Sequence, residues 1–237
     1  MYSYRKRLRR ICVARLDVWL VEKGHCSSRQ VAKRAIKEGM VTVNGIQYNK
    51  PSKQVSGKED INISPDYVDM PMGYHKLQEI DNQLEGNLVT LPCIALDIGS
   101  SAGGFLAYLN DKGATAIGIE VAQRFSEDLT RLAKTNTRIS VIFDDAFTID
   151  PIIIVDEGGL DLLLVDVTTE IDGTLNLISR FSELLKKGGR LVAAFKTDNP
   201  DIVLQLLESV TSLGFIDVQS IYLDGSRQEA HIIGCHR

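Results

Sequence analysis

The chain lacks the cysteine and histidine spacings that hold metal ions. Its four cysteines, at positions 12, 26, 93 and 235, form no Cys-x-x-Cys pair, and its four histidines stand at no metal-ligand spacing from them. We therefore expect no metal site, and reduced cysteines of the kind that cytoplasmic proteins carry.

Long apolar runs are also missing. No uninterrupted apolar stretch reaches the ~18 residues that a membrane span needs. The N-terminal run 4–10 is basic, but it is not followed by the apolar stretch of a secretory signal. No strongly amphipathic membrane-binding helix stands out. These absences predict a cytoplasmic protein without a membrane partner.

A dinucleotide fingerprint, G-x-G-x-x-G, is absent as well, although the chain has a glycine loop in the right setting. Residues 97–105 read D-I-G-S-S-A-G-G-F and follow a short apolar strand at 94–96. Strand, glycine turn and helix start predict a nucleotide-binding corner of an α/β sheet. Ser101 occupies the middle glycine position, which favours a ligand without a pyrophosphate, and S-adenosylmethionine fits this description. The residues expected to contact this ligand are Asp97, Gly99, Ser100, Ser101, Gly103, Gly104 and Phe105.

The residues after position 91 alternate between apolar strands and helices, which predicts an α/β fold with a Rossmann-like sheet. Between the last two strands stands only a turn at 224–226, so we expect the sheet to end in an antiparallel hairpin. The expected strands are 94–98, 115–119, 139–143, 160–165, 190–195, 217–223 and 229–235. The expected helices include 122–134, 173–187 and 200–213.

Acidic residues stand at the ends of the first three strands of this sheet. Glu120 follows the second strand, where a carboxylate can accept both hydroxyls of an adenosine ribose. Asp145 follows the third strand and can accept from the adenine amine. Asp97, at the end of the first, can hold the glycine loop or the amino group of a methionine moiety.

Charge is distributed unevenly. Residues 1–60 hold 14 Lys and Arg against 5 Asp and Glu, a balance of +9, whereas residues 61–237 have a balance of −13. A small basic block joined to an acidic α/β block suggests that the first part binds a polyanion.

The basic block itself is patterned as two helices and a hairpin. A first helix is expected at 15–23, and a second, capped by Ser27 or Ser28, ends at Gly39. An Asn-Gly pair at 44–45, flanked by alternating residues, predicts a tight hairpin. Cations at i, i+4 and i+8 of the second helix form a stripe along which a nucleic acid could lie. That stripe consists of Arg29, Lys33 and Lys37, with Arg34 beside it.

The R-L-D, S-S-R, A-I-K-E-G and V-x-V-N-G motifs of residues 13–63 resemble, in this order, the S4-type RNA-binding domain. This resemblance implies α+β structure and binding of structured RNA through the second helix and the hairpin loop. It carries over an RNA-binding role to Arg15, Arg29, Lys33 and Asn44.

Four further residues suggest chemistry. Asp166 ends the fourth strand, Lys196 ends the fifth, Glu229 opens the last, and Lys76 lies in a helical segment between the two blocks. Ligands of open α/β sheets bind outside the carboxyl ends of the strands, so Asp166 and Lys196 are expected to face the cofactor.

With this last set, the chain resembles the FtsJ-like ribose methyltransferases, and most closely their TlyA-like (haemolysin-A-like) subgroup, which joins an S4-type domain to such an enzyme. The family's Lys-Asp-Lys-Glu tetrad maps onto Lys76, Asp166, Lys196 and Glu229. The resemblance implies 2′-O-methylation of ribosomal RNA by S-adenosylmethionine, with ribosomal RNA or ribosomal subunits as partners. It leaves the target nucleotide, the subunit and the oligomeric state open.

We expect Lys196 to be the base, with its pKa lowered by burial and neighbouring cations. Asp166 and Glu229 would orient the lysines, and Lys76 would position the ribose. The alternative is a non-catalytic ribosome-assembly factor that keeps the methyltransferase fold. Methylation of a base amino group is disfavoured, because Asp166-Val-Thr-Thr stands where such enzymes carry Asn/Asp-Pro-Pro-Tyr/Phe.

The organisation predicted from these observations has four parts: a basic arm at 1–12, the RNA-binding domain at 13–63, a linker and helix at 64–90, and the methyltransferase domain at 91–237.

Overall fold

The computed structural model describes residues 13–26, 28–65, 70–223 and 229–237. The chain divides into two units between Asp69 and Met70. The predicted basic arm at 1–12 and the turn at 224–226 lie outside the described residues. Within the described ranges, no helix is both long enough and apolar enough to cross a bilayer.

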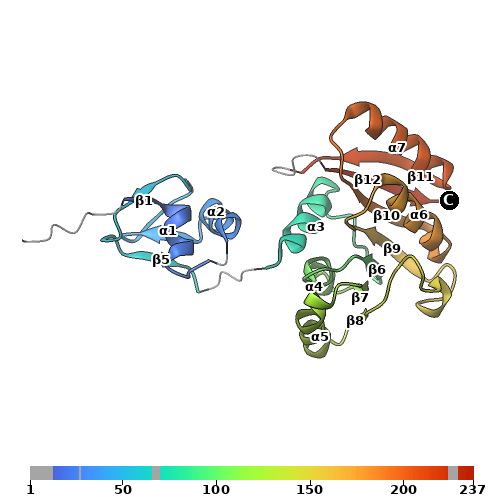
Figure 1. Cartoon of the computed structure of the whole chain (residues 1–237), viewed down its shortest axis with the longest axis horizontal. Helices are drawn as coiled ribbons and strands as arrows, with labels where there is room; N and C mark the ends of the chain where they lie inside the picture. The colour runs from blue at the N-terminus through green and yellow to red at the C-terminus, as the bar shows by residue number, and fades with distance from the viewer. Residues whose placement is uncertain (1–12, 27, 66–69, 224–228) are drawn as a thin grey trace, which may run out of the picture. The chain divides into compact units, whose positions relative to one another are not determined.

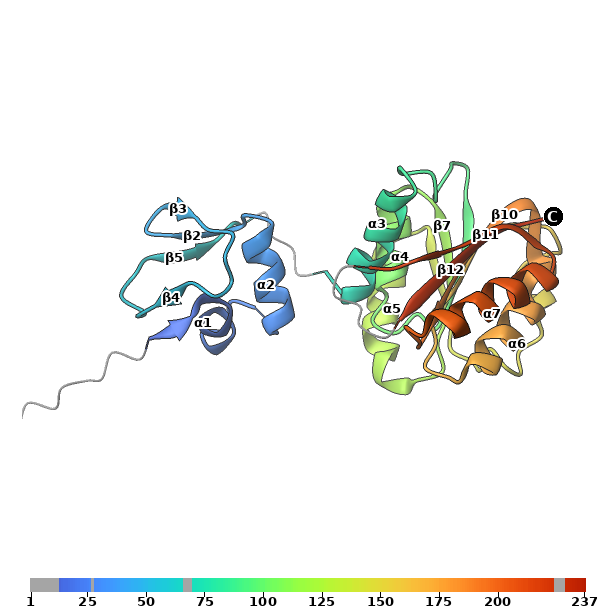
Figure 2. The ribbon, with the colours of Figure 1, turned by 90° about the horizontal axis from the view of Figure 1, so that it is seen from above.

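The first unit packs two short helices against small antiparallel sheets (Figure 2). Its core consists of apolar side chains from both helices and from the strands, including Leu16, Leu20, Ile36 and Val41, all fully buried. Its elements are β1 (Ala14–Arg15), α1 (Leu16–Glu22), α2 (Arg29–Lys37), β2 (Val41–Val43), β3 (Ile46–Gln47), β4 (Gln54–Val55) and β5 (Ile61–Ile63).

Local chemistry explains these boundaries. Ser28 caps α2 by accepting a hydrogen bond from the Val31 amide at 3.3 Å. Asn44 and Gly45 both have positive φ, as a two-residue hairpin requires, and they join β2 to β3 with Val43 opposite Ile46. The predicted helices and hairpin are therefore present. The pairing of β1 with β4 was not predicted, since two-residue strands leave no periodic signal.

The second unit is built on a seven-stranded sheet in the order β11-β12-β10-β9-β6-β7-β8. Only β12 runs antiparallel to its neighbours in this sheet, which confirms the expected antiparallel end. Its strands are β6 (Ile94–Ile98), β7 (Thr115–Ile119), β8 (Ile139–Ile142), β9 (Leu160–Val165), β10 (Leu185–Phe195), β11 (Phe215–Ile221) and β12 (Ala230–His236).

Helices cover both faces of this sheet. Figures 1 and 2 show α3, α4 and α5 on one face and α6 and α7 on the other. Their bounds are α3 (Met72–Gln83), α4 (Gly104–Asp111), α5 (Ser126–Thr135), α6 (Ile171–Phe181) and α7 (Pro200–Ser212). Short 3₁₀ helices occur at Gln123–Phe125, Pro151–Ile153 and Ser182–Leu184.

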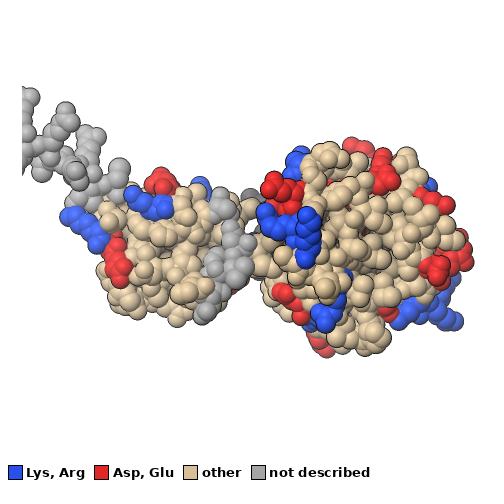
Figure 3. Space-filling model, turned by 90° about the horizontal axis from the view of Figure 1, so that it is seen from below, with Lys and Arg blue, Asp and Glu red and all other residues tan. Residues whose placement is uncertain are grey.

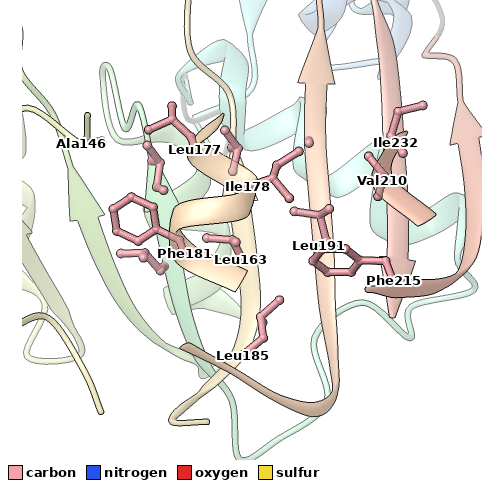
Figure 4. Packing of buried hydrophobic residues seen from close by; sticks show 14 of the residues in the cluster. Ala146, Leu163, Leu177, Ile178, Phe181, Leu185, Leu191, Val210, Phe215 and Ile232 are labelled. Carbon is pink, nitrogen blue, oxygen red and sulfur yellow. The ribbon is translucent and has the colours of Figure 1, made fainter. Parts of the chain in front are cut away.

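The face under α6 and α7 holds the larger apolar core. Figure 4 shows Phe181 and Ile178 of α6 packed against Leu163 of β9, with Phe215 against Leu191 of β10. Because aromatic and branched side chains are buried on both faces of the sheet, the apolar pattern of each strand determines which of its residues face α6 and α7 and which face the helices on the other side. The same register determines where each strand ends, and the predicted site residues stand at these ends.

The helix predicted at 173–187 is wrong in its last part. The α-helix ends at Phe181, and β10 already begins at Leu185, which pairs with Leu160. The reason lies in the glycine pair at 188–189. Gly188 has φ +77, and a Cβ on Gly189 would lie 2.9 Å from the carbonyl oxygen of Lys186, so this stretch forms an irregular strand.

Helix α3 packs closely on α4. A Cβ on Gly104 would lie 2.5 Å from the amide nitrogen of Tyr74, so the two backbones approach to a distance that only glycine permits. The buried carboxylate of Asp81 holds the other end of α3. It accepts hydrogen bonds from the Tyr108 hydroxyl at 2.6 Å and the Leu88 amide at 2.9 Å, and it pairs with Lys112 at 2.9 Å.

Burial alone would raise the pKa of Asp81, but these three donors outweigh it and lower the pKa, so the group is a carboxylate at neutral pH. Replacing it with alanine leaves buried donors unpaired. We expect Asp81→Ala to lower the free energy of unfolding at pH 7 by about 3 kcal/mol, measured by urea denaturation. Asn82→Ala, an exposed neighbour on the same helix, is the control; equal stabilities of the two variants would contradict this role.

Candidate active site

The site lies where the strand order of the sheet reverses, at the carboxyl ends of β6 and β9. The Asp166 amide donates to the carbonyl of Ile98 at 3.0 Å. Gly99 follows with φ +90, and a Cβ there would lie 2.4 Å from the carbonyl oxygen of Asp166. This glycine therefore lets the loop after β6 pass against the end of β9, at the point where open α/β sheets bind ligands.

Two lysines and two carboxylates form a closed ring of ion pairs beside this point. Lys76 Nζ lies 2.7 Å from Asp166 Oδ2 and 2.9 Å from Glu229 Oε2. Lys196 Nζ lies 3.2 Å from Asp166 Oδ1 and also pairs with Glu229 Oε1. The structure thus brings together all four residues predicted to be catalytic, although they come from α3 and from the ends of three strands.

Within the ring Lys196 is the member most open to solvent. Its side chain is 44% exposed, whereas that of Lys76 is 15% exposed and that of Glu229 is 14% exposed. An incoming group can therefore reach Lys196 from solvent, while Lys76 and Glu229 form the inner side of the ring.

The charges of the ring stabilise one another. Burial would raise the pKa of Asp166 and of Glu229, but the lysines outweigh it and lower both values. Burial would lower the pKa of Lys196, but Asp166 and Glu229 outweigh it and raise the value. The expectation of a lowered Lys196 pKa is therefore wrong for this arrangement, because two carboxylates, and not cations, are its nearest partners.

Asp97 lies fully buried at the end of β6, and neither of its carboxylate oxygens has a hydrogen-bond partner among the described residues. Burial raises its pKa to about 7; the nearby Ser100 hydroxyl acts against this shift, and the charges of Asp166 and Glu120 add to it. A buried carboxyl without a donor is costly, and such a group at a strand end is a good candidate for binding a cationic ligand.

Glu120 at the end of β7 ties the glycine loop to the sheet. Its Oε2 accepts from the Ser101 amide and its Oε1 from the Ala122 amide, both at 2.7 Å. Ser101 holds φ +50, a conformation that non-glycine residues adopt at a cost. Glu120 is predicted to accept hydrogen bonds from the ribose hydroxyls. In that role its two oxygens would accept from the hydroxyls as well as from the amides of Ser101 and Ala122.

Two cavities meet at the glycine loop. The first has a volume of about 300 Å³ and lies beyond the ends of β6, β7 and β9. The predicted ligand-binding residues that line it are Gly99, Ser101, Glu120, Asp145 and Asp166. The second, of about 230 Å³, lies between the N-terminal ends of α3 and α4 and reaches Lys76. The residues that line both cavities are Gly99, Ser101 and Asp166.

The other predicted ligand-binding residues divide into two groups. Ser100, Gly104 and Phe105 line the second cavity. Asp97 and Gly103 line neither cavity. Gly103 has φ +78 and lies close to Leu132, so its glycine is explained by packing. Among the described residues no cluster of three or more His, Cys, Asp or Glu side chains could hold a metal ion.

In the first unit a buried carboxylate organises two of the predicted RNA-binding arginines. Asp17, with a fully buried side chain, accepts from Arg15 Nε at 2.9 Å and Nη2 at 3.1 Å, and from Arg29 Nη2 at 3.3 Å. Sequence reasoning missed this role of Asp17, although the R-L-D motif contained it. The side chains of Arg15 and Arg29 are each more than a third exposed.

The remaining predicted RNA-binding residues differ in their surroundings. Lys33 and Lys37 are exposed on α2, one and two turns after Arg29, whereas Arg34 is half-buried. The Asn44 side chain accepts from the Asp60 amide at 2.9 Å and so fastens the hairpin to the segment before β5. On the face of the second unit drawn in Figure 3, basic and acidic side chains are interspersed.

Comparison with known families matches both units. The S4 domain matches residues 14–61, and the FtsJ-like methyltransferase family matches residues 70–233. The second match covers more than two thirds of the chain and includes all four members of the ring.

Individual relatives are similar over shorter stretches. A Bacillus subtilis protein provisionally named the rRNA methyltransferase YqxC is 34% identical over 42% of this chain and 35% of its own length. The 16S/23S rRNA (cytidine-2′-O)-methyltransferase TlyA of Mycobacterium tuberculosis is 33% identical over 44% of this chain and 39% of its own. The aligned region thus spans little more than a third of these curated relatives.

A solved structure from Streptococcus thermophilus, provisionally described as a hemolysin, matches the fold of both units. It covers 95% of this chain and 89% of its own, with 20% identity and a TM-score of 0.55.

The unpartnered carboxyl of Asp97 makes stability depend on pH. Its folded pKa of about 7 lies above the ordinary value of 3.8, so the folded state keeps a proton that the unfolded state loses. This contribution is fully present below pH 4 and is lost as pH rises to 7. We expect Asp97→Asn to be more stable than the native chain at pH 8, by several kcal/mol, and to lose that advantage at pH 4.5.

Urea denaturation at the two pH values measures this difference. The control is Asp198→Asn, at an exposed position of the same sheet edge. An advantage of Asp97→Asn that is the same at both pH values would contradict the raised pKa.

Proposed function

Because the chain belongs to the FtsJ-like methyltransferase family, we propose that it transfers the methyl group of S-adenosylmethionine to a ribose 2′-hydroxyl of ribosomal RNA. The observation that carries this proposal is the ring of Lys76, Asp166, Lys196 and Glu229 at the strand-order reversal, beside the glycine loop. The relatives named as rRNA methyltransferases, one of them cytidine-2′-O-specific, support the choice of substrate. A protein with this substrate works among cytoplasmic ribosomes.

The residues present fit S-adenosylmethionine. The first cavity, with Glu120 and Asp145, suits the ribose and adenine, and the second, with Lys76 at its edge, suits the methionine end. Asp97 is fully buried and lines neither cavity, so the methionine ammonium would reach its unpartnered carboxylate only when the glycine loop shifts. That pairing would remove the cost of the buried charge. When bound, this cofactor supplies a methyl group on a sulfonium, already activated and leaving behind a neutral thioether. Gly99 lines both cavities, so a ligand that fills both would cross the glycine loop at this residue.

The ring then acts on the hydroxyl. The 2′-oxygen forms the new bond to the methyl carbon and must lose its proton. Lys196, the exposed member of the ring, accepts that proton when its amine is neutral and passes it to water. Lys76 holds the ribose oxygen in line, and Asp166 and Glu229 fix both ammonium groups. No metal step is needed for this scheme.

RNA affinity comes from the first unit. The basic balance of residues 1–60 and the arginine pair on Asp17 provide phosphate contacts. The second unit is acidic overall and has no comparable excess of cations. We therefore assign substrate capture to the S4-type unit and chemistry to the methyltransferase unit.

The catalytic assignment is tested by methyl transfer to ribosomal RNA from a strain that lacks this protein. The native chain is expected to produce a 2′-O-methyl nucleoside, identified by mass spectrometry. Lys196→Ala is expected to lower the rate by about 10²- to 10⁴-fold. Lys187→Ala, an exposed lysine on the same strand, is the control and should keep the native rate.

The pH profile refines the role of Lys196. Because its pKa is raised, only its small neutral fraction accepts a proton at pH 7, so kcat/KM should rise about tenfold per pH unit between pH 7 and 9. Unchanged transfer by Lys196→Ala would contradict the mechanism. A product methylated on a base would still support the cofactor site, but it would contradict the role proposed for the ring. Tight RNA binding without any transfer would favour the assembly-factor alternative.

The capture role is tested by RNA binding at several salt concentrations. Lys33→Ala should weaken binding of a ribosomal RNA transcript at every salt concentration and reduce the slope of log Kd against log salt by about 1. Lys134→Ala, an exposed lysine of the second unit, is the control. A loss in both variants of equal size would contradict the assignment of capture to the first unit.

A further inference from the structure

A buried histidine lies under the ring and takes no part in the mechanism above. His231 is 1% exposed, and neither of its ring nitrogens has a hydrogen-bond partner within the described part of the chain. Its polar neighbours are Glu229, whose Oε2 lies 3.6 Å from Nε2, and the backbone of Ile221 on the adjacent strand. Buried polar atoms without partners are rare enough to require an explanation.

The register of β12 places this side chain. Successive residues of a strand face opposite sides, so His231 and Ile233 share one face of β12, and the carboxylate of Glu229, the residue just before the strand, lies 3.6 Å from the His231 ring. Ile233 packs in the apolar cluster that contains Leu77 and Ile80 of α3, which identifies that face as the one under α3. His231 therefore lies on the same side of the sheet as Lys76 and directly below Glu229.

His231 is neutral in this environment. Burial, followed by the charge of Lys76, lowers its pKa to about 4, against which Glu229 and Asp166 act only in part. A neutral imidazole carries one N–H. The carboxylate 3.6 Å from Nε2 favours the proton on that nitrogen, in competition with the Ile221 backbone near the imidazole, since a lone pair facing Oε2 would be repelled.

Glu229 needs such a donor once the ring opens. In the closed ring its Oε2 accepts from Lys76 and its Oε1 from Lys196. When a hydroxyl binds between the lysines, one ammonium turns toward it, and a carboxylate with a largely buried side chain loses a donor at considerable cost. Nε2 of His231 stands 3.6 Å from Oε2, roughly half an ångström beyond hydrogen-bond length.

Building on the proposed function, we propose that His231 is a positioning residue: its Nε2–H closes on Glu229 Oε2 and keeps this carboxylate in place when a lysine of the ring engages the ribose hydroxyl. The residue touches neither substrate nor cofactor, and it acts through Glu229. This role also explains why position 231 holds a polar side chain, although apolar residues fill the surrounding positions on this face of the sheet.

Kinetics provide the first test, with three variants of the full chain. His231→Leu keeps the volume and removes the donor, and it should lower kcat by about 10- to 100-fold, as expected for a lost hydrogen bond to a charged group. His231→Gln places an amide N–H near the Nε2 position and should recover most of the rate. Binding of S-adenosylmethionine and of ribosomal RNA should stay within about twofold of native in all variants.

The matched control is His236→Leu. This histidine lies on the same strand, packs at a tilt against Phe215, and has no ion pair or hydrogen bond with the four ring residues among the described contacts. It should leave kcat unchanged, and thermal melts should show that both leucine variants are folded. A native kcat in His231→Leu would overturn the proposal, as would an equal loss in His236→Leu.

An activity-independent measurement separates this proposal from the proposed function. Nitrogen NMR of the imidazoles in the full chain without ligand should show His231 neutral down to about pH 4, with its proton on Nε2. A proton on Nδ1 would overturn the positioning role. A native chain that transfers no methyl group, while His231 shows the expected tautomer, would refute the proposed function alone.

Discussion

The site depends on one electrostatic constraint: two lysines share two carboxylates in a closed ring. Each charge is held by two of the opposite sign, so four ionised groups can lie partly buried without a large penalty for desolvation. The ring also fixes the tertiary structure locally, since its members come from α3 and from the ends of β9, β10 and β12. The buried carboxylate of Asp81 and the close contact at Gly104 hold α3 against this sheet, and with it Lys76.

This constraint conflicts with proton removal, and the conflict defines how the site must work. Carboxylates that stabilise the ring raise the pKa of Lys196, whereas a base must be neutral. A positive charge beside the ring acts in the opposite direction, because it disfavours a second cation nearby. When S-adenosylmethionine is bound as proposed, the positive charge of its sulfonium would lower the pKa of Lys196 again. Under the proposed function, the charge of the cofactor itself would therefore be what makes the base available.

Much of this could be predicted from sequence, for reasons that particular residues make clear. The glycine loop, the strand ends and the alternation of strands and helices leave periodic or compositional signals, and Asp166, Lys196 and Glu229 were found at strand ends. Lys76 was assigned through the resemblance to the family's tetrad. The end of α6 was predicted wrongly because the apolar run continues into β10 through Leu185, and only Gly188 and Gly189 signal the break. The direction of the Lys196 pKa shift required knowledge of which charges meet. His231 was missed, although it stands two residues after Glu229.

The division of charge between the two units follows from the same chemistry. A pocket for a cationic cofactor needs carboxylates, and Asp97, Glu120, Asp145 and Asp166 all stand at strand ends of the second unit. Such an edge repels phosphates, so under the proposed function the affinity for RNA has to reside elsewhere in the chain. The basic first unit meets this requirement. In it the buried carboxylate of Asp17 orients the guanidinium groups of Arg15 and Arg29, and under the proposed function their remaining donors are left for phosphate. In the proposed function, RNA capture and methyl transfer lie in different units because their electrostatic demands are opposite.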